Sequence, residues 1–386
     1  MNKIYRVGDK KKIAVNTRFL IKNRLEGIGL FTYESLKRIT KAHPEIDFYF
    51  LFDRKFDEEF IFGDNIKPVV LFPQARHTFL WYWWFEISVA RWLKKNNPNL
   101  FLSTDGYACL NTDVPQVLVI HDLAYEHYKE HVYGLARSYY RYFMPKFAQK
   151  AQRIATVSKF SKNDIIQRYH IPADKIDVVY NGAKEVYQPV GDEIKKAVRG
   201  RYTEGEDYFL YVGSIHPRKN VKTLLLAFDE FKKQTKSDFK LLIVGRKAWD
   251  FNEVEKVHSQ MQFGNDVKFL GHMEPEELAQ ITASAYAMVY VSLFEGFGIP
   301  IVEAMSCGVP VITSNVTSMP EAAGDAGLWV DPLSGSEISA AMKRLVEDKS
   351  LREDLISKGR IQLKKFSWDL TAEKLWACCE KVMNAR

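Results

Sequence analysis

The chain has 386 residues, which is too long for one ordinary domain and fits two of moderate size. Its 46% hydrophobic and 27% charged residues are typical of a folded protein and exclude a largely disordered chain.

Residues 1–189 hold 29 Lys and Arg against 20 Asp and Glu, net +9, and the remainder is net −2. The basic half faces water or an anionic partner such as a membrane surface or a phosphorylated acceptor. Nucleic acid is not expected, because the sequence has no zinc-finger spacing and no RNA-binding aromatic motif.

The N-terminus, MNKIYRVGDKKKIAVNTRFL, has no apolar core of signal-peptide length, and nowhere do eighteen apolar residues run together. We therefore expect a cytoplasmic protein. Reduced structural thiols, rather than metal ligands or disulfides, are expected at the cysteines, because no C-x-x-C spacing links Cys109, Cys307, Cys378 and Cys379.

The first half alternates strands with helices, which is typical of a parallel sheet. A strand, a glycine-bearing loop and a helix come first, and a buried strand that ends in polar residues follows later. The expected elements are strands at 12–20, 47–52 and 115–123, a helix at 31–43, and a strand, serine turn and helix over 153–169.

The same alternation restarts after residue 190. Strands are expected at 207–215, 240–246, 287–296 and 308–314, with a helix at 221–234. The connecting stretch YNGAKEVYQPVGDEI holds Gly, Pro and a change of composition, so we place the boundary near residue 188. Two doubly wound, Rossmann-like α/β domains result, 1–188 and 189–366.

Polar residues collect where the expected strands end. They are His121 and Asp122, the run from Ser214 to Asn220, Gly245 with Arg246, and Glu295. Because open α/β sheets bind ligands at the carboxyl ends of their strands, two facing domains would line one cleft suited to a two-substrate transfer.

The stretch GSIHPRKN, residues 213–220, joins a strand to a helix. Gly213 permits close backbone approach, and Arg218 and Lys219 stand at the helix entrance. Backbone N–H groups, the helix dipole and two cations indicate an anion site that suits a diphosphate. The alternative is that both cations are simply solvated.

Two weaker signals lie in the first half. The loop RLEGIGLFTYE has only Gly27 and Gly29 of the dinucleotide fingerprint, so it either approaches a phosphate or sugar or is a plain turn. His121, at a strand end, could hydrogen-bond a sugar hydroxyl or act as acid or base, with a purely structural histidine as the alternative.

The stretch FEGFGIPIVEAMSCGVPV, residues 294–311, places glutamates on either side of a glycine turn. Pro300 fits the first turn of a helix that ends at Gly308. We expect Glu303 in that first turn, where the helix dipole favours a carboxylate. Capping explains Glu303 but does not explain Glu295 beside Gly296 and Gly298.

Taken together, these stretches resemble a known family. The Glu-x7-Glu pattern of FEGFGIPIVE, with YVGSIHPRKN and FLGHMEPEEL before it, is similar to the family-four retaining glycosyltransferases of the GT-B fold. GIGLFTYE, VIHDLAYEHY, ATVSKFSKNDI and VVYNG follow in family order, so the resemblance covers nearly the whole chain. It implies a C-terminal helix, 367–386, that crosses back onto the first domain.

The resemblance also implies roles for residues. Glu295 would contact donor-sugar hydroxyls and Glu303 the ribose, while Arg218 and Lys219 would neutralise the diphosphate and His121 would contact the sugar near the reacting centre. The expected donor and nucleotide contacts are Gly27, Gly29, Gly213, Ser214, Asn220, Gly245, Gly271, His272, Gly296, Phe297, Gly298, Ile299, Pro300, Ile301 and Glu303.

Members of the family retain the anomeric configuration through front-face attack, so no enzyme nucleophile is implied. The sequence has no Asp-x-Asp spacing, which favours a reaction without metal or other cofactor. Ser214 stands where many members carry Arg, and Arg218 would supply that cation. The implied donor is a GDP- or UDP-linked hexose, mannose among them, and the acceptor is a glycan or a lipid-linked sugar of bacterial surface polysaccharide. The alternatives are a GT-B epimerase and a non-catalytic sugar-nucleotide-binding relative.

Membrane contact is a separate hypothesis. The segment 77–100 combines four tryptophans with Arg91, Lys94 and Lys95, the composition of an interfacial helix. The same aromatics could pack in the core instead. If they contact lipid, the protein would work at the inner face of the plasma membrane.

Overall fold

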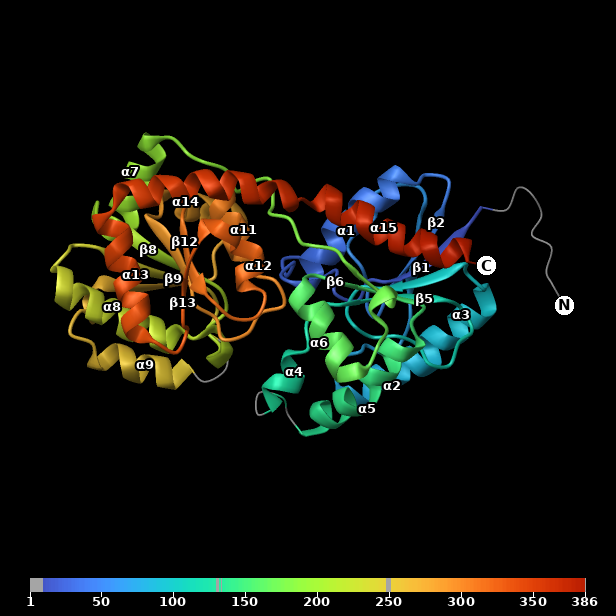
Figure 1. Cartoon of the computed structure of the whole chain (residues 1–386). Helices are drawn as coiled ribbons and strands as arrows, with labels where there is room; N and C mark the ends of the chain where they lie inside the picture. The colour runs from blue at the N-terminus through green and yellow to red at the C-terminus, as the bar shows by residue number, and fades with distance from the viewer. Residues whose placement is uncertain (1–9, 130–131, 133, 248–250, 386) are drawn as a thin grey trace. The chain divides into compact units, whose positions relative to one another are not determined.

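A computed structural model describes residues 10–129, 132, 134–247 and 251–385 (Figure 1). The expectation about the extreme N-terminus falls on residues 1–9, outside this description. The chain divides into two compact units, Met1–Asn181 with Trp368–Arg386, and Gly182–Ser367. The sequence pattern placed the boundary near residue 188. The first unit ends earlier, at Asn181, because the segment from Gly182 onward packs on the second unit.

The first unit is built on a parallel sheet whose described strands follow the order β3-β2-β1-β4-β5-β6-β7. Its core strands are apolar on both faces and covered by helices, as a parallel sheet requires. The strands are β1 Lys12–Asn16, β2 Asp47–Phe52, β3 Ile66–Val70, β4 Leu100–Ser103, β5 Gln116–Ile120, β6 Arg153–Thr156 and β7 Ile176–Val178.

Along the chain, helices alternate with the strands of the first unit. The last helix, α15, also belongs to this unit and contacts α1. They are α1 Ile28–Ala42, α2 Thr78–Trp83, a π-helical turn Trp84–Val89, α3 Ala90–Asn96, α4 Ala124–His127, α5 Gly134–Lys150, α6 Lys159–Tyr169 and α15 Trp368–Asn384. Among the four tryptophans of the 77–100 segment, Trp84 is fully buried and Trp83 is exposed.

The second unit has a parallel sheet of order β10-β9-β8-β11-β12-β13. Its elements are α7 Asp192–Thr203, β8 Tyr208–Val212, α8 Val221–Thr235, β9 Lys240–Val244, α9 Phe251–Gln260, β10 Val267–Gly271, α10 Pro275–Ser284, β11 Ala287–Tyr290, α11 Ile299–Ser306, β12 Val311–Ser314, α12 Met319–Ala323, β13 Gly327–Val330, α13 Gly335–Glu347 and α14 Lys349–Gln362. Two doubly wound α/β units are therefore confirmed.

Each sheet reverses its strand order once, between β1 and β4 in the first and between β8 and β11 in the second. Connections on either side of such a reversal leave toward opposite faces, which opens a crevice at the carboxyl edge. The polar residues expected to form sites follow β5, β8, β9 and β11, so each unit brings its own set to that edge.

Candidate active site

The carboxyl ends of β8 and β11 are tied together by a short turn and a loop. The turn is the 3-10 helix Pro217–Lys219, and the loop runs from 291 to 298. Leu293 donates its N–H to the Arg218 carbonyl at 2.8 Å, and the Arg218 guanidinium donates to the Phe294 carbonyl at 3.0 Å. The expected strand 287–296 therefore ends at Tyr290, because the backbone beyond it bonds to this turn instead of continuing the sheet.

Three charged side chains meet in this loop. The Glu295 carboxylate is buried, and it accepts hydrogen bonds from Lys219 Nζ and from Arg218 Nη1, the latter at 3.2 Å. Burial alone would raise the pKa of Glu295, but the Lys219 ammonium and the Arg218 guanidinium outweigh it and lower the pKa to about 2. The structure thus brings Arg218, Lys219 and Glu295 into one charged cluster, ionised at any physiological pH.

Tyr290, which the sequence analysis missed, joins this cluster. Its hydroxyl lies 2.8 Å from Lys219 Nζ and 3.0 Å from Glu295 Oε1, and its ring is stacked on Tyr211 at 6.1 Å. The hydroxyl can accept from the ammonium and donate to the carboxylate at the same time. The available signal was a polar aromatic at the last position of an otherwise apolar strand.

Gly298, the residue before α11, has a left-handed conformation with φ 103°, and a Cβ there would lie 3.0 Å from Met319. Pro300 has no N–H, and the Ile301 N–H donates to the Gly298 carbonyl. Within the run 298–301, the amides of Gly298 and Ile299 are therefore the candidates for a ligand. Phe297, expected beside them, packs edge-on against Phe366 at 5.3 Å.

The expected first-turn position of Glu303 is wrong. Because α11 begins at Ile299, Glu303 is its fifth residue and lies in the second turn, where it cannot cap the helix. Its carboxyl is buried, and burial raises the pKa to about 7 against the opposing effects of Lys184 and of a hydrogen bond with Tyr187. Capping therefore does not explain Glu303, and a buried carboxyl near neutrality calls for another explanation.

Glycines end three neighbouring strands at the same edge. Gly213 follows β8, Gly245 follows β9 and Gly271 ends β10; Gly213 donates to the Val244 carbonyl and Gly245 to the Gly271 carbonyl. A Cβ at Gly245 would lie 1.9 Å from the Gly213 carbonyl oxygen, so no side chain fits there. At these three positions the edge presents backbone without side chains. His272 and Ser214 are exposed beside it.

Asn220 has a positioning role in the structure. Its side-chain amide donates to the Val291 carbonyl at 3.0 Å and to the Pro332 carbonyl at 2.7 Å. Both amide hydrogens are thus committed within the protein. The residue ties the turn that carries Lys219 to the loops that follow β11 and β13.

His121 lies in the first unit, one residue beyond β5. Its Nε2 is 2.9 Å from the Thr104 carbonyl oxygen, so this nitrogen donates, and its ring packs edge-on against Phe31 at 4.9 Å. Burial lowers the pKa of His121 despite the carbonyl and the nearby carboxylates. The imidazole is therefore neutral at pH 7, with Nδ1 as a hydrogen-bond acceptor.

Gly27 and Gly29 lie at the start of α1 in the same unit. Gly27 is exposed with φ 49°, while Gly29 is buried, and a Cβ on Gly29 would lie 2.8 Å from the Phe19 carbonyl oxygen. The Gly29 N–H already donates to the Glu26 carbonyl. Of the two glycines, Gly27 is the one whose backbone can face a ligand, and Gly29 is required by packing.

A buried ion pair spans the reversal point of the first sheet. Arg18, beyond β1, lies 2.5 Å from Asp105, beyond β4, and its guanidinium stands 4.2 Å from the Tyr107 ring centroid. A pair this deeply buried holds the two strand ends in fixed positions. Sequence reasoning missed it because Arg18 falls within the run assigned to the first strand.

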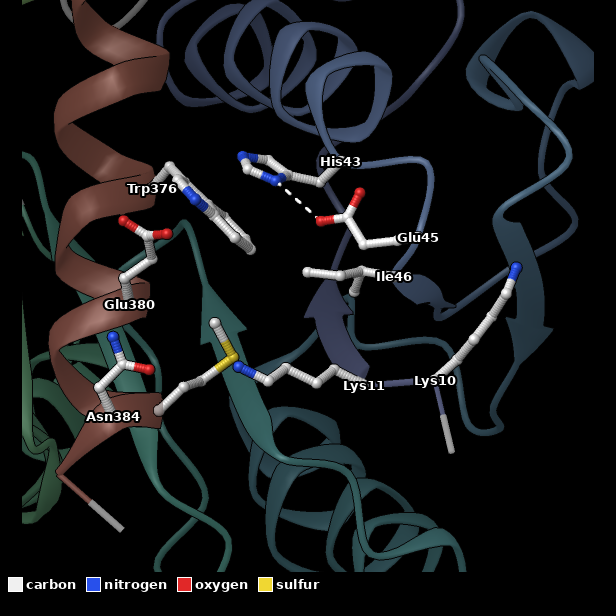
Figure 2. Close-up of a pocket in the computed structure, with 9 residues that line it drawn as sticks. Lys10, Lys11, His43, Glu45, Ile46, Trp376, Glu380 and Asn384 are labelled. Carbon is white, nitrogen blue, oxygen red and sulfur yellow. Dashed lines mark hydrogen bonds and ion pairs between the residues drawn. The ribbon is translucent and has the colours of Figure 1, made fainter. Parts of the chain in front are cut away.

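A cavity of about 390 Å³ lies elsewhere in the first unit, at the amino end of β1. His43 is stacked on Trp376 with ring centroids 3.8 Å apart, and its Nδ1 lies 3.2 Å from Glu45 Oε1; Figure 2 shows these side chains at the cavity. The lysines that line it, Lys10 and Lys11, come from the edge opposite to the strand ends that carry the candidate site. This cavity is therefore separate from the predicted chemistry.

Two negative observations concern the described part of the chain. Within residues 10–129, 132, 134–247 and 251–385, no three His, Cys, Asp or Glu side chains cluster as metal ligands would. In the same residues, no helix combines the length and apolarity needed to cross a membrane.

Comparison with known proteins gives two family matches in sequence order. Residues 25–185 match the model described as Glycosyltransferase Family 4, and residues 193–362 match Glycosyl transferases group 1. Among solved structures, Anabaena Alr3699/HepE in complex with UDP and glucose aligns with a TM-score of 0.75 at 18% identity, over 96% of this chain and 100% of that one. WaaG, a glycosyltransferase involved in lipopolysaccharide biosynthesis, aligns with a TM-score of 0.73 at 15% identity, over 94% and 98%.

Two curated relatives are mannosyltransferases. The O-antigen chain mannosyltransferase B of Escherichia coli is 38% identical over 220 residues, 57% of this chain and 58% of that protein. RfbU, an O-antigen chain mannosyltransferase of Salmonella typhimurium, is 27% identical over 293 residues, 75% and 76% of the two chains. The chain thus spans little more than half the length of the first of these relatives. With both family models matched and the GT-B fold in place, it belongs to the glycosyltransferases that join a family 4 half to a group 1 half.

Proposed function

We propose that this chain transfers a hexose, with mannose the first candidate, from a nucleoside-diphosphate sugar to a hydroxyl of a glycan or lipid-linked acceptor. The reaction retains the anomeric configuration, needs no metal and contributes to bacterial surface polysaccharide. The single observation that carries the proposal is the pairing of the buried Glu295 carboxylate with the partly exposed Lys219 and Arg218 at the reversal point of the second sheet. The mannosyltransferase relatives favour mannose, and the donor base stays open between guanine and uracil.

The cluster suits a sugar diphosphate in charge and in position. The Glu295 carboxylate pairs with both cations, so the three side chains together keep one net positive charge. An incoming diphosphate offers Lys219 and Arg218 a stronger counter-charge, which releases Glu295 to accept hydrogen bonds from sugar hydroxyls. The amides of Gly298 and Ile299, at the positive end of α11, lie in the same loop and favour the anion further.

The bond changes balance without a protein nucleophile. The bond between the anomeric carbon and the phosphate oxygen breaks, and its electrons remain on that oxygen. The acceptor oxygen attacks the same face, and its proton passes to the departing phosphate. Lys219 and Arg218 stabilise the charge that grows on the phosphate, while neutral His121 is proposed to hydrogen-bond the donor sugar through Nδ1.

The remaining donor contacts are proposed for residues at the carboxyl edge of the second sheet. Gly213, Gly245 and Gly271 leave the backbone there without side chains, and a nucleotide base is proposed to lie against it, with the exposed His272 beside it. Glu303 is proposed to accept from the ribose hydroxyls. We place the protein in the cytoplasm and, with a lipid-linked acceptor, at the inner face of the plasma membrane.

The proposal is tested by following a panel of UDP- and GDP-sugars in two steps. A thermal-shift screen identifies the donor, because a bound ligand raises the melting temperature by linkage. Slow turnover of that donor without acceptor then separates the alternatives. Release of nucleoside diphosphate supports a transferase, interconversion of sugars would assign an epimerase, and binding with neither reaction would assign a non-catalytic relative.

A further inference from the structure

Thr317, in the loop after β12, has a backbone conformation that threonine rarely adopts. Its φ is 57°, and no other β-branched residue in the described part of the chain has a left-handed φ. The branched side chain disfavours this region, so such a residue is an outlier. The conformation is common directly after a helix. Four other residues have it there, namely Asn97, His170, Glu204 and Lys236, but Thr317 follows no helix.

The outlier lies in a tight turn. The Met319 N–H donates to the Val316 carbonyl at 3.3 Å, which closes four residues into a turn. The third residue of the turn, Ser318, has φ −87° and ψ −4°. A positive φ at the second residue, followed by these angles at the third, is the pattern of a type II′ turn, whose second position favours glycine. Threonine is therefore strained at a position that glycine would occupy freely.

Two side chains of this turn bind the backbone of Glu295. The Glu295 N–H donates to the Thr317 hydroxyl at 3.4 Å, and the Ser318 hydroxyl donates to the Glu295 carbonyl at 2.8 Å. Ser318 is fully buried, so its contact is shielded from water. Glu295 lies in the loop 291–298, beyond the end of β11. The turn therefore holds, at both backbone polar groups, the residue whose carboxylate pairs with Lys219 and Arg218.

The segments on both sides of the turn are fixed without the Thr317 hydroxyl. The Ser314 hydroxyl, at the end of β12, donates to the Ser292 carbonyl at 2.6 Å. On the other side, the fully buried Met319 begins α12 and lies where a Cβ on Gly298 would meet it at 3.0 Å. α11 and α12 are in contact and lie side by side in Figure 1. Loss of the hydroxyl should therefore loosen Glu295 without unfolding the loop.

We propose that Thr317 is a positioning residue for Glu295, whose hydroxyl holds the Glu295 amide so that the carboxylate meets the donor sugar. Glycine would relax the turn but would leave the amide without this acceptor, which explains a threonine at a strained position. Because a displacement of about 1 Å can lower a rate roughly 100-fold, a backbone contact of this kind affects catalysis. The inference rests on the proposed function for the ligand of Glu295, whereas the contact with Thr317 belongs to the ligand-free chain.

The experiment compares three substitutions by acceptor-independent release of nucleoside diphosphate. Thr317→Ser keeps the hydroxyl and should retain kcat within about twofold. Thr317→Val and Thr317→Gly remove it, so kcat should fall roughly tenfold in each, with KM nearly unchanged because Lys219 and Arg218 still hold the diphosphate. Thr317→Gly should nevertheless melt at or above the wild-type temperature, since glycine suits the turn. Wild-type kcat in Thr317→Gly, or equal losses in Thr317→Ser and Thr317→Val, would overturn the proposal.

A double substitution shows whether Thr317 acts through Glu295. In a Glu295→Ala background, Thr317→Gly should change the release rate by less than about twofold, and a further tenfold loss would contradict the positioning role.

Hydrogen exchange of the Glu295 amide tests the contact itself in the ligand-free chain. Exchange should be roughly fivefold faster in Thr317→Val and Thr317→Gly than in the wild type and Thr317→Ser. Equal exchange in all four proteins would overturn the proposal. If the wild type released no nucleoside diphosphate, the proposed function would fail, and this exchange would still decide the contact.

The matched control is Lys236→Gly in the same unit. Lys236 is exposed, has φ 52° and follows α8, at the opposite end of that helix from Lys219. Glycine relaxes a left-handed residue there as it does at Thr317, but far along the helix from the charged cluster. We expect an unchanged kcat. A tenfold fall in this variant would mean that backbone relaxation, and not loss of the hydroxyl, lowers the rate, which would overturn the proposal.

Discussion

Donor affinity should increase as the pH rises from 6 to 8, through ionisation of Glu303. The carboxyl is buried, and its pKa is raised to about 7 in the ligand-free chain. Only the ionised form can accept two ribose hydroxyl hydrogens, so the competent fraction is about one tenth at pH 6 and about nine tenths at pH 8. Because apparent affinity scales with that fraction, the dissociation constant should fall roughly tenfold.

The assay is isothermal titration with an intact sugar nucleotide, whose diphosphate carries no group that titrates in this range. Glu303→Gln is the control, because it keeps the volume and removes the ionisation. We expect a pH slope in the wild type and a flat profile in the variant, with proton release on wild-type binding near pH 7. Equal slopes in both proteins, or tighter binding at pH 6, would refute the assignment of Glu303 to the ribose.

The same carboxyl affects folding in the absence of donor. A pKa raised above the unfolded value of 4.5 means that the stabilising contribution is present below that value and is lost as the pH rises through about 7. Between pH 5 and pH 8, the wild type should lose roughly 2.5 kcal/mol of unfolding free energy relative to Glu303→Gln. Denaturant unfolding at both pH values measures this difference.

Four further substitutions test the cluster and the glycine edge. Lys219→Ala and Glu295→Ala should each lower nucleoside diphosphate release by roughly 100- to 1,000-fold with the fold retained by circular dichroism, and unchanged turnover in either would remove the site assignment. Tyr290→Phe deletes the hydroxyl between Lys219 and Glu295, so kcat should fall by about tenfold with little change in KM, whereas a purely structural role would lower only the melting temperature. Gly245→Ala should lower the melting temperature by several degrees, because its Cβ would meet the Gly213 carbonyl at 1.9 Å, while Gly335→Ala, whose nearest neighbour is 4.0 Å away, should be neutral.

Much of the fold followed from local pattern. Apolar runs ended by polar residues predicted the parallel strands, and glycine and proline marked the turns on either side of α11. Element ends were less predictable, because backbone hydrogen bonds between distant segments decide them. The strand at 287 ends at Tyr290 since Leu293 bonds to Arg218, a contact 75 residues away in sequence.

The candidate site was predictable in its members but not in its geometry. The order of the motifs predicted that Arg218, Lys219 and Glu295 belong to one site. In the structure, ion pairs join Glu295 to both cations. Tyr290 was missed because a tyrosine in a buried strand has no distinctive spacing. Glu303 was expected one turn too early because Pro300 fits the second helical position as well as the first, and α11 in fact begins one residue before it, at Ile299.

In the proposed function, Lys219 and Arg218 hold the diphosphate of the donor while Glu295 holds its sugar. The most direct test is proton NMR of the sugar released from the matched donor, with wild type and Lys219→Ala followed side by side. We expect nucleoside diphosphate release by the wild type with the anomeric configuration of the first sugar product retained, and loss of that release in the variant. Inverted product, or equal release by Lys219→Ala, would contradict it.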